Sequence, residues 1–181
     1  STTTYTVSGV GSNGCSNTAM VMVTVNPSPS VTANSSAASV CTGNSVTLTG
    51  GGASTYAWSG GVINAVAFVP TATMTYTVTG TGSNGCTNTA TTTVTVNALP
   101  TVTASSSAAA ICAGANVTLT GGGASTYAWS GGVTNAVAFM PTATMTYTVT
   151  GTNVNGCVNT AMITVTVNPL PVVTANSSPV S

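Results

Sequence analysis

Hydrophobic and polar residues alternate with period two along most of the chain. The stretch 74–79 places Met74, Tyr76 and Val78 on one side and threonines on the other. Successive side chains of a β-strand point to opposite faces, so this pattern predicts a strand with one buried and one polar face. No helical stripe competes with the alternation. Four further segments repeat it: 45–49, 55–58, 66–68 and 92–97.

The same pattern recurs along the chain at a fixed interval. Cys15, Cys86 and Cys157 are equally spaced and define a 71-residue period. At this offset, 47 of the 57 positions of 41–97 are identical in 112–168, without a gap. A period of this length is too long for a solenoid turn or a propeller blade. It fits a small independent domain that is repeated in tandem.

Proline-containing segments separate the repeats. They lie at 26–29, 97–100 and 168–171. Proline fixes φ and donates no hydrogen bond to a sheet, so each segment predicts the end of a strand and a short, stiff joint. The predicted domains are the last part of one repeat (1–27), two complete repeats (28–98 and 99–169) and the first strand of the next repeat (170–181).

Glycine-rich segments mark turns between the predicted strands of a repeat. With the segment 101–103 that follows Pro100, a repeat contains six or seven short strands. This predicts an all-β fold of tandem Ig-like antiparallel β-sandwich domains. Four aromatic residues that recur with the repeat are predicted core residues: Trp58, Trp129, Tyr76 and Tyr147.

The sequence contains no Lys, Arg, Asp, Glu or His among its 181 residues. It therefore offers no side-chain carboxylate or imidazole for acid–base catalysis, no amine for a Schiff base and no cation for phosphate. We expect neither enzymatic activity nor a nucleic-acid partner, and we assign no catalytic, cofactor-binding or metal-binding residue. Without charges that repel other copies, we expect the chain to associate with itself.

The mean hydropathy is positive, at +0.45, but the hydrophobic residues are dispersed. The longest strongly apolar run, 65–69, is far shorter than the roughly 20 residues of a membrane-spanning helix. The positive value comes mainly from Ala and Val distributed among Thr. We therefore expect no direct insertion into a membrane.

Two cysteines recur in each repeat and are predicted to form disulfides, which places the protein outside the cytosol. The favoured scheme joins Cys41 to Cys86 and Cys112 to Cys157, with Cys15 bonded to a residue upstream. It closes each small sandwich on itself, where covalent support is expected. The competing scheme joins Cys15 to Cys41 and Cys86 to Cys112 across the proline joints. Both schemes respect the 71-residue period.

Three phrases of the repeat resemble tandem Ig-like (PKD-like) repeats of very large bacterial surface proteins, including gliding and adhesion filaments exported by type IX secretion. The phrases lie at 75–81, 84–90 and 94–100, and again at 146–152, 155–161 and 165–171. The resemblance covers the whole chain. It implies a secreted, surface-attached, fibrous role, in which such repeats usually form the stalk.

Two functions are consistent with these features. The first is a structural segment of an extracellular fibre or adhesin stalk that associates with other copies or with neighbouring repeats. The second is a module that binds glycans or another surface through inter-strand loops such as 50–54 and 60–65. These loops are nearly identical in the two complete repeats, as a uniform stalk would have them. The first function is therefore favoured.

Overall fold

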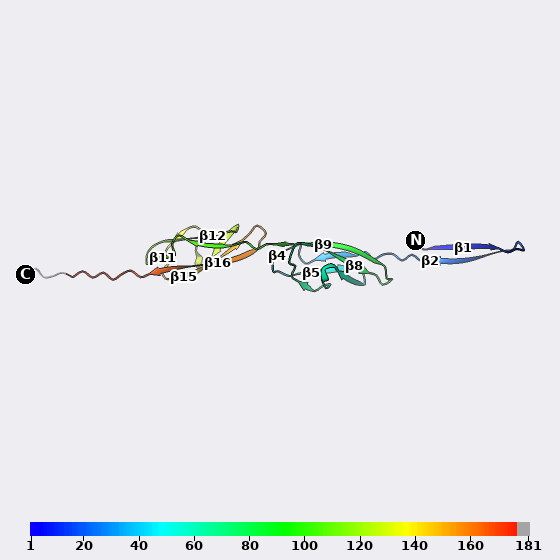
Figure 1. The fold of residues 1–181 in the computed structure, drawn as a ribbon, viewed down its shortest axis with the longest axis horizontal. Helices are drawn as coiled ribbons and strands as arrows, with labels where there is room; N and C mark the ends of the chain where they lie inside the picture. The colour runs from blue at the N-terminus through cyan, green and yellow to red at the C-terminus, as the bar shows by residue number, and fades with distance from the viewer. Residues whose placement is uncertain (177–181) are drawn as a thin grey trace, which may run out of the picture. The chain divides into compact units, whose positions relative to one another are not determined.

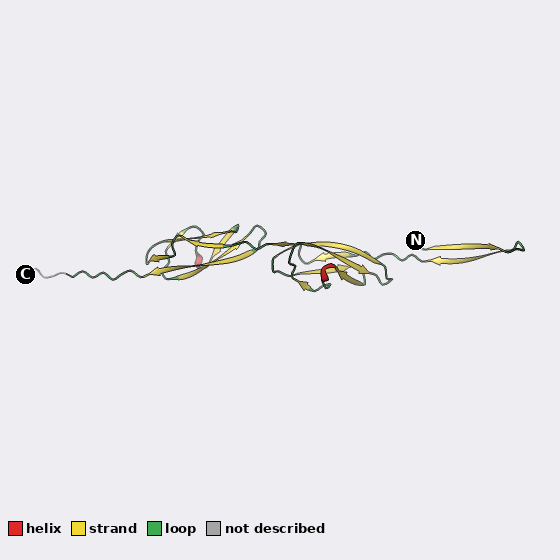
Figure 2. Cartoon of the chain, viewed as in Figure 1, coloured by secondary structure: helices red, strands yellow, loops and turns green. Residues whose placement is uncertain are grey.

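The alternating residues form β-strands. The computed structural model describes residues 1–176. The chain is all-β, and the described part contains only two single-turn 3-10 helices (Figures 1 and 2). Contacts divide it into two units, Ser1–Val96 and Asn97–Ser181. Each unit contains one complete Ig-like β-sandwich, and each is described by itself.

The first complete repeat consists of two facing sheets. One sheet has three strands in the order β3-β5-β7, and the other has four in the order β4-β9-β8-β6. The bounds are β3 (Thr32–Ser35), β4 (Ser39–Cys41), β5 (Val46–Gly51), β6 (Thr55–Trp58), η1 (Ser59–Gly61), β7 (Ala67–Phe68), β8 (Met74–Thr81) and β9 (Thr87–Asn97).

The second complete repeat has the same architecture. Its sheets have the orders β10-β12-β14 and β11-β16-β15-β13, and β11 runs parallel to β16. The bounds are β10 (Thr103–Ser106), β11 (Ala110–Cys112), β12 (Val117–Gly122), β13 (Thr126–Trp129), η2 (Ser130–Gly132), β14 (Ala138–Phe139), β15 (Met145–Thr152) and β16 (Val158–Asn168).

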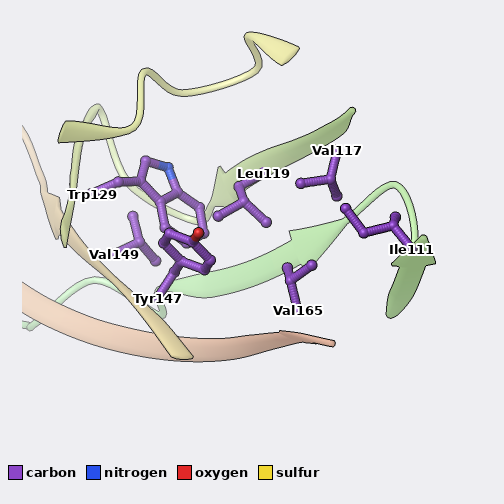
Figure 3. Packing of buried hydrophobic residues seen from close by; sticks show 7 residues of the cluster. All are labelled: Ile111, Val117, Leu119, Trp129, Tyr147, Val149 and Val165. Atoms are coloured by element: carbon purple, nitrogen blue, oxygen red, sulfur yellow. The ribbon is translucent and has the colours of Figure 1, made fainter. Parts of the chain in front are cut away.

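The core of each sandwich is built by the inward side chains of both sheets. All four predicted core aromatics are buried: Trp58 and Trp129 are 8% exposed, and Tyr76 and Tyr147 are 4% exposed. Figure 3 shows the buried cluster of the second complete repeat. There Trp129 and Tyr147 lie among Val149, Val165, Leu119, Val117 and Ile111. The prediction of these core residues agrees with the structure.

Some local expectations differ from the structure. Gly50 and Gly51 belong to one of the glycine-rich segments that predict turns, but they end strand β5. Glycine is required at Gly50 because the ring of Tyr56 packs on it and would overlap any Cβ. Met74 and Val66 lie on the hydrophobic side of the alternating segments 74–79 and 66–68. They are nevertheless 45% and 50% exposed because they lie at or beyond the ends of their strands.

The segments outside the complete repeats also follow the period. Strands β1 (Thr3–Val10) and β2 (Ser16–Val23) pair in the register of β8 and β9, but no second sheet covers them. Tyr5 is therefore 58% exposed, whereas its equivalent Tyr76 is buried. At the other end, 170–176 carry no strand. The rest of that predicted strand, 177–181, lies outside the described residues.

Candidate functional site

The turn between β8 and β9 holds the incoming linker of the first complete repeat. The side-chain amide of Asn84 donates to the carbonyl of Pro27 at 2.9 Å, and that of Asn88 donates to the carbonyl of Pro29 at 3.0 Å. The thiol of Cys86 lies 3.8 Å from the carbonyl oxygen of Asn26. We call the end of a repeat where the chain enters the sandwich its head; the linker is hydrogen-bonded to the head.

The second repeat forms the same head with one residue exchanged. The amide of Asn153 donates to the carbonyl of Ala98, and that of Asn159 donates to the carbonyl of Pro100, both at 3.0 Å. Asn153 replaces Gly82 in the alignment, yet its side chain makes the bond that Asn84 makes in the first repeat. The linker contact thus persists although the residue that makes it has changed.

Sequence reasoning missed these asparagines as linker contacts. Locally, Asn84 indicates only an Asn-Gly turn, and no pattern distinguishes Asn88. The signal that could have identified Asn88 is its recurrence with the repeat as Asn17 and Asn159. Asparagine at such a place can satisfy the carbonyls that proline segments leave without a sheet partner.

The opposite end of the sandwich carries the other cysteine. In the second repeat Cys112 is the last residue of β11 and lies opposite Asn168, the last residue of β16. The amide N–H of Ala113 donates to the carbonyl of Asn168 at 2.9 Å. We call this end of a repeat, where the chain leaves the sandwich, its tail.

The structure does not contain the favoured disulfides. Cys86 and Cys112 are free, whereas Cys41 and Cys157 are disulfide-bonded. Cys157 directly precedes the 11-residue strand β16, and Cys112 lies opposite its last residue. At about 3.3 Å per residue, the two cysteines of this repeat lie roughly 35 Å apart, whereas a disulfide requires Cα atoms about 4.4–6.8 Å apart. The prediction of a disulfide within each repeat is therefore wrong, and the competing scheme also requires bonds at Cys15, Cys86 and Cys112, which are free.

Trp58 and Trp129 are both buried core residues. The indole N–H of Trp58 donates to the side-chain oxygen of Asn64 at 3.0 Å, and the same oxygen accepts the amide N–H of Gly50 at 2.7 Å. Trp129 makes the equivalent bond with Asn135. With the indole buried and its polar atom satisfied, this tryptophan offers no open ring face on which a sugar could stack.

The outer face of β8 and β9 is lined with threonine. Four directly opposed pairs contain only this residue: Thr75–Thr93, Thr77–Thr91, Thr79–Thr89 and Thr81–Thr87. The hydroxyls of the first pair are hydrogen-bonded at 2.8 Å, and those of the equivalent pair Thr146–Thr164 at 2.7 Å. We call this surface of the first repeat the threonine face. It is polar but uncharged, so it can contact another surface without the desolvation of ions.

The loop expected to carry ligand specificity forms a mainly aliphatic hollow. Its lining includes Val62, Ile63, Val66 and Phe68, with backbone from the two preceding glycines. Ile63 is replaced by Thr134 in the second repeat. Sugar-binding sites combine apolar contact with several converging polar groups, and this lining supplies no side-chain polar group. The hollow therefore gives little support to a glycan site.

Within residues 1–176, no group of three or more potential metal-ligating side chains lies together. No helix in that part of the chain is long and apolar enough to cross a membrane. These findings concern the described residues only.

We expect the folded repeats to resist acid. Acid denaturation arises mostly from carboxylates that are paired in the native state and from buried histidines that must become charged. The sequence contains none of these groups, so the bound proton number of its side chains does not change between neutral pH and about pH 2. The melting temperature, followed by far-ultraviolet circular dichroism, should change by less than about 5 °C over this range. Loss of the β-sheet signal at pH 2 would contradict this expectation.

No protein-family model and no curated protein sequence matches the chain. Among solved structures it is similar to tandem cadherin extracellular repeats. A structure of PcdhgB3 EC1-4 is 12% identical with a TM-score of 0.26, and the match covers 93% of this chain and 57% of that one. For mouse cadherin-23 EC22-24 the values are 13% and 0.27, with coverage of 92% and 74%. The chain thus spans less than two thirds of the PcdhgB3 structure.

Proposed function

We propose that the chain is a structural segment of an extracellular bacterial fibre or adhesin stalk. The observation that carries the proposal is the repeated head. Two sandwiches of the same architecture each bind their own incoming linker through asparagine amides. A linker that is bonded to its domain has less conformational freedom than a free one. Such repeats suit a stalk that must transmit position and load.

The uniformity of the repeats supports the same role. The segments 41–97 and 112–168 are identical at 47 of 57 aligned positions, and the exchanges leave the shared core residues unchanged. The resemblance to PKD-like repeats of bacterial surface proteins supports a secreted location, and the disulfide-bonded Cys41 and Cys157 fit an oxidising environment.

Self-association is the second part of the proposal. The threonine face presents neutral hydroxyls, and the strands at the sheet edges carry no charged residue that would oppose pairing. Other copies of the chain or neighbouring repeats are therefore the proposed partners. Contacts of this kind depend on hydrogen bonds and apolar burial and only weakly on charge.

Light scattering of the full-length protein across a salt series tests the proposal. We expect the scattering mass to exceed that of one chain and to change by less than about twofold between about 20 mM and about 1 M NaCl, because no charged side chain is present to be screened. A single-chain mass at all concentrations, or an association that weakens steeply with salt, would overturn it.

A charged variant sharpens the test. Thr91→Lys places a cation on the threonine face and should reduce association at low salt, with recovery as salt rises. Thr71→Lys adds the same charge at an exposed loop position and serves as the matched control. Equal loss of association in both variants would show that net charge, and not the threonine face, decides the result.

A further inference from the structure

The head of each complete repeat contains an Asn-Gly pair in the turn between its two longest strands. The pairs are Asn84-Gly85, between β8 and β9, and Asn155-Gly156, between β15 and β16. Both glycines have positive φ, +79° and +76°, and each N–H donates to the carbonyl of the residue three positions earlier at 3.0 Å. A Cβ added to either glycine would meet no atom within 4 Å. The two backbones therefore form the same turn, open to solvent.

In the first complete repeat the side-chain amide of the pair is held by two hydrogen bonds. Nδ2 of Asn84 donates to the carbonyl of Pro27 at 2.9 Å, and Oδ1 accepts the backbone N–H of Cys86 at 3.1 Å. A nucleophile that attacks the amide carbon Cγ makes this planar carbon tetrahedral. Both amide atoms then move, so the attack disrupts both hydrogen bonds.

In the second complete repeat a different asparagine makes both of these bonds. Nδ2 of Asn153 donates to the carbonyl of Ala98, and its Oδ1 accepts the backbone N–H of Cys157, each at 3.0 Å. The equivalent position in the first repeat is Gly82, where an added Cβ would lie 2.9 Å from Oδ1 of Asn84. A side chain at this position therefore displaces the asparagine of the Asn-Gly pair from the linker.

The displaced side chain is that of Asn155. Its backbone N–H donates to Oδ1 of Asn153 at 3.0 Å, which fixes the backbone of the turn. Its side chain is exposed and, within residues 1–176, makes no hydrogen bond. The amide can therefore rotate toward the backbone nitrogen of Gly156, and glycine has no side chain to obstruct the approach.

We propose that Asn155-Gly156 is a site of spontaneous deamidation and that Asn84-Gly85 is protected from the same reaction. The backbone nitrogen of Gly156 loses its proton to hydroxide and attacks Cγ of Asn155, which closes a five-membered imide ring. The bond from Cγ to Nδ2 breaks, and ammonia leaves with a proton taken from water. A second water molecule then opens the ring at either carbonyl and leaves aspartate or isoaspartate. The net reaction exchanges an amide for a carboxylate and consumes one water molecule.

The product adds a charge to a chain whose sequence has no charged side chain. An exposed carboxyl group is ionised at neutral pH. The linker bond of the second repeat survives, because Asn153 makes it and is not modified. The same reaction at Asn84 would instead replace the donor that binds the carbonyl of Pro27 with an acceptor. The reactive pair is thus the one whose modification leaves the head intact.

Peptide mass spectrometry of the full-length protein tests the proposal. The folded protein is incubated at neutral pH in heavy-oxygen water, so that each new carboxylate carries the label. It is then digested with an acid protease, because trypsin has no site in the chain. We expect Asn155 to react at least about tenfold faster than Asn84, since two hydrogen bonds of ordinary strength protect the latter. Equal rates, or a faster reaction at Asn84, would overturn the proposal.

The same measurement in denaturing urea identifies the cause of the difference. Unfolding removes the protecting bonds, so the two pairs should then react at rates within about threefold of each other. A tenfold difference that persists in the unfolded chain would show that the flanking residues, and not the linker contacts, decide the rates.

Two reciprocal substitutions exchange the environments of the pairs. Gly82→Asn gives the first repeat the residue of the second and should raise the rate at Asn84 toward that of Asn155. Asn153→Gly removes the competing side chain and should lower the rate at Asn155 toward that of Asn84. Each variant alters one turn, so the other turn of the same molecule is its matched control. Unchanged rates in both variants would contradict protection by the linker bonds.

Discussion

We expect Leu48→Ala to lower the free energy of unfolding of the first complete repeat by about 2–5 kcal/mol. Leu48 is fully buried in the cluster with Trp58 and Tyr76. Truncation removes its apolar surface from the core and leaves a cavity that a sheet-on-sheet interface closes only in part. Because a domain of this size is stable by about 5–15 kcal/mol, the variant loses a large part of its stability.

Hydrogen exchange detected by mass spectrometry measures this effect repeat by repeat. Protection should fall in β5, β8 and β9, whereas the second repeat keeps its own Leu119 and should be unaffected. Met74→Ala is the matched control, since Met74 is 45% exposed and its loss should cost less than about 1 kcal/mol. Equal effects of the two substitutions would show that Leu48 is not a core residue.

Gly52→Ala is expected to destabilise the same repeat by several kcal/mol, on the order of 3 or more. Gly52 has φ of +81°, and a Cβ added there would overlap the carbonyl oxygen of Ser30. The methyl group therefore adds a steric clash with backbone to the cost of the left-handed conformation. The strand that begins at Thr32 would have to move away from β5.

Gly43→Ala separates these two costs. Gly43 also has positive φ, at +91°, but an added Cβ would meet no atom within 4 Å. Its substitution should cost only the conformational penalty of about 1–2 kcal/mol. Denaturant unfolding of the two variants measures the difference, and equal midpoints would contradict the packing of Gly52 against Ser30.

The fold could be predicted from the sequence because its signals are local. Period-two alternation places Val46, Leu48 and Val78 on inward faces, and the structure buries all three. The 71-residue period fixes the number of complete sandwiches without any knowledge of their packing. The place of Gly50 within a strand could not be predicted because its cause is tertiary: the ring of Tyr56 packs on it, and Tyr56 lies on another strand.

The cysteine arrangement could not be predicted because it depends on the position of one short strand. The order of Cys41, Trp58 and Cys86 resembles that of an immunoglobulin domain, which favours a disulfide across the sandwich. In the second repeat the segment before the equivalent of Cys41 forms β11, parallel to β16, which carries the cysteine to the tail. Parallel pairing between distant segments leaves no local sequence signal.

The linker contacts were missed for a related reason. Asn84 and Asn88 donate to carbonyls that lie 57 and 59 positions earlier in the sequence. The local sequence indicates a turn at this place. The hydrogen bonds from the two side chains to the linker depend instead on where the chain enters the sandwich. Asn88 recurs as Asn159, and recurrence of this kind is the pattern to seek in other tandem arrays.

Cryo-electron microscopy of the full-length protein, purified without reductant at near-physiological salt, tests the proposed function most directly. We expect fibres in which one β-sandwich recurs for every repeat of the sequence. Dispersed single chains that do not associate at any concentration would contradict the proposal that these repeats build an extracellular fibre.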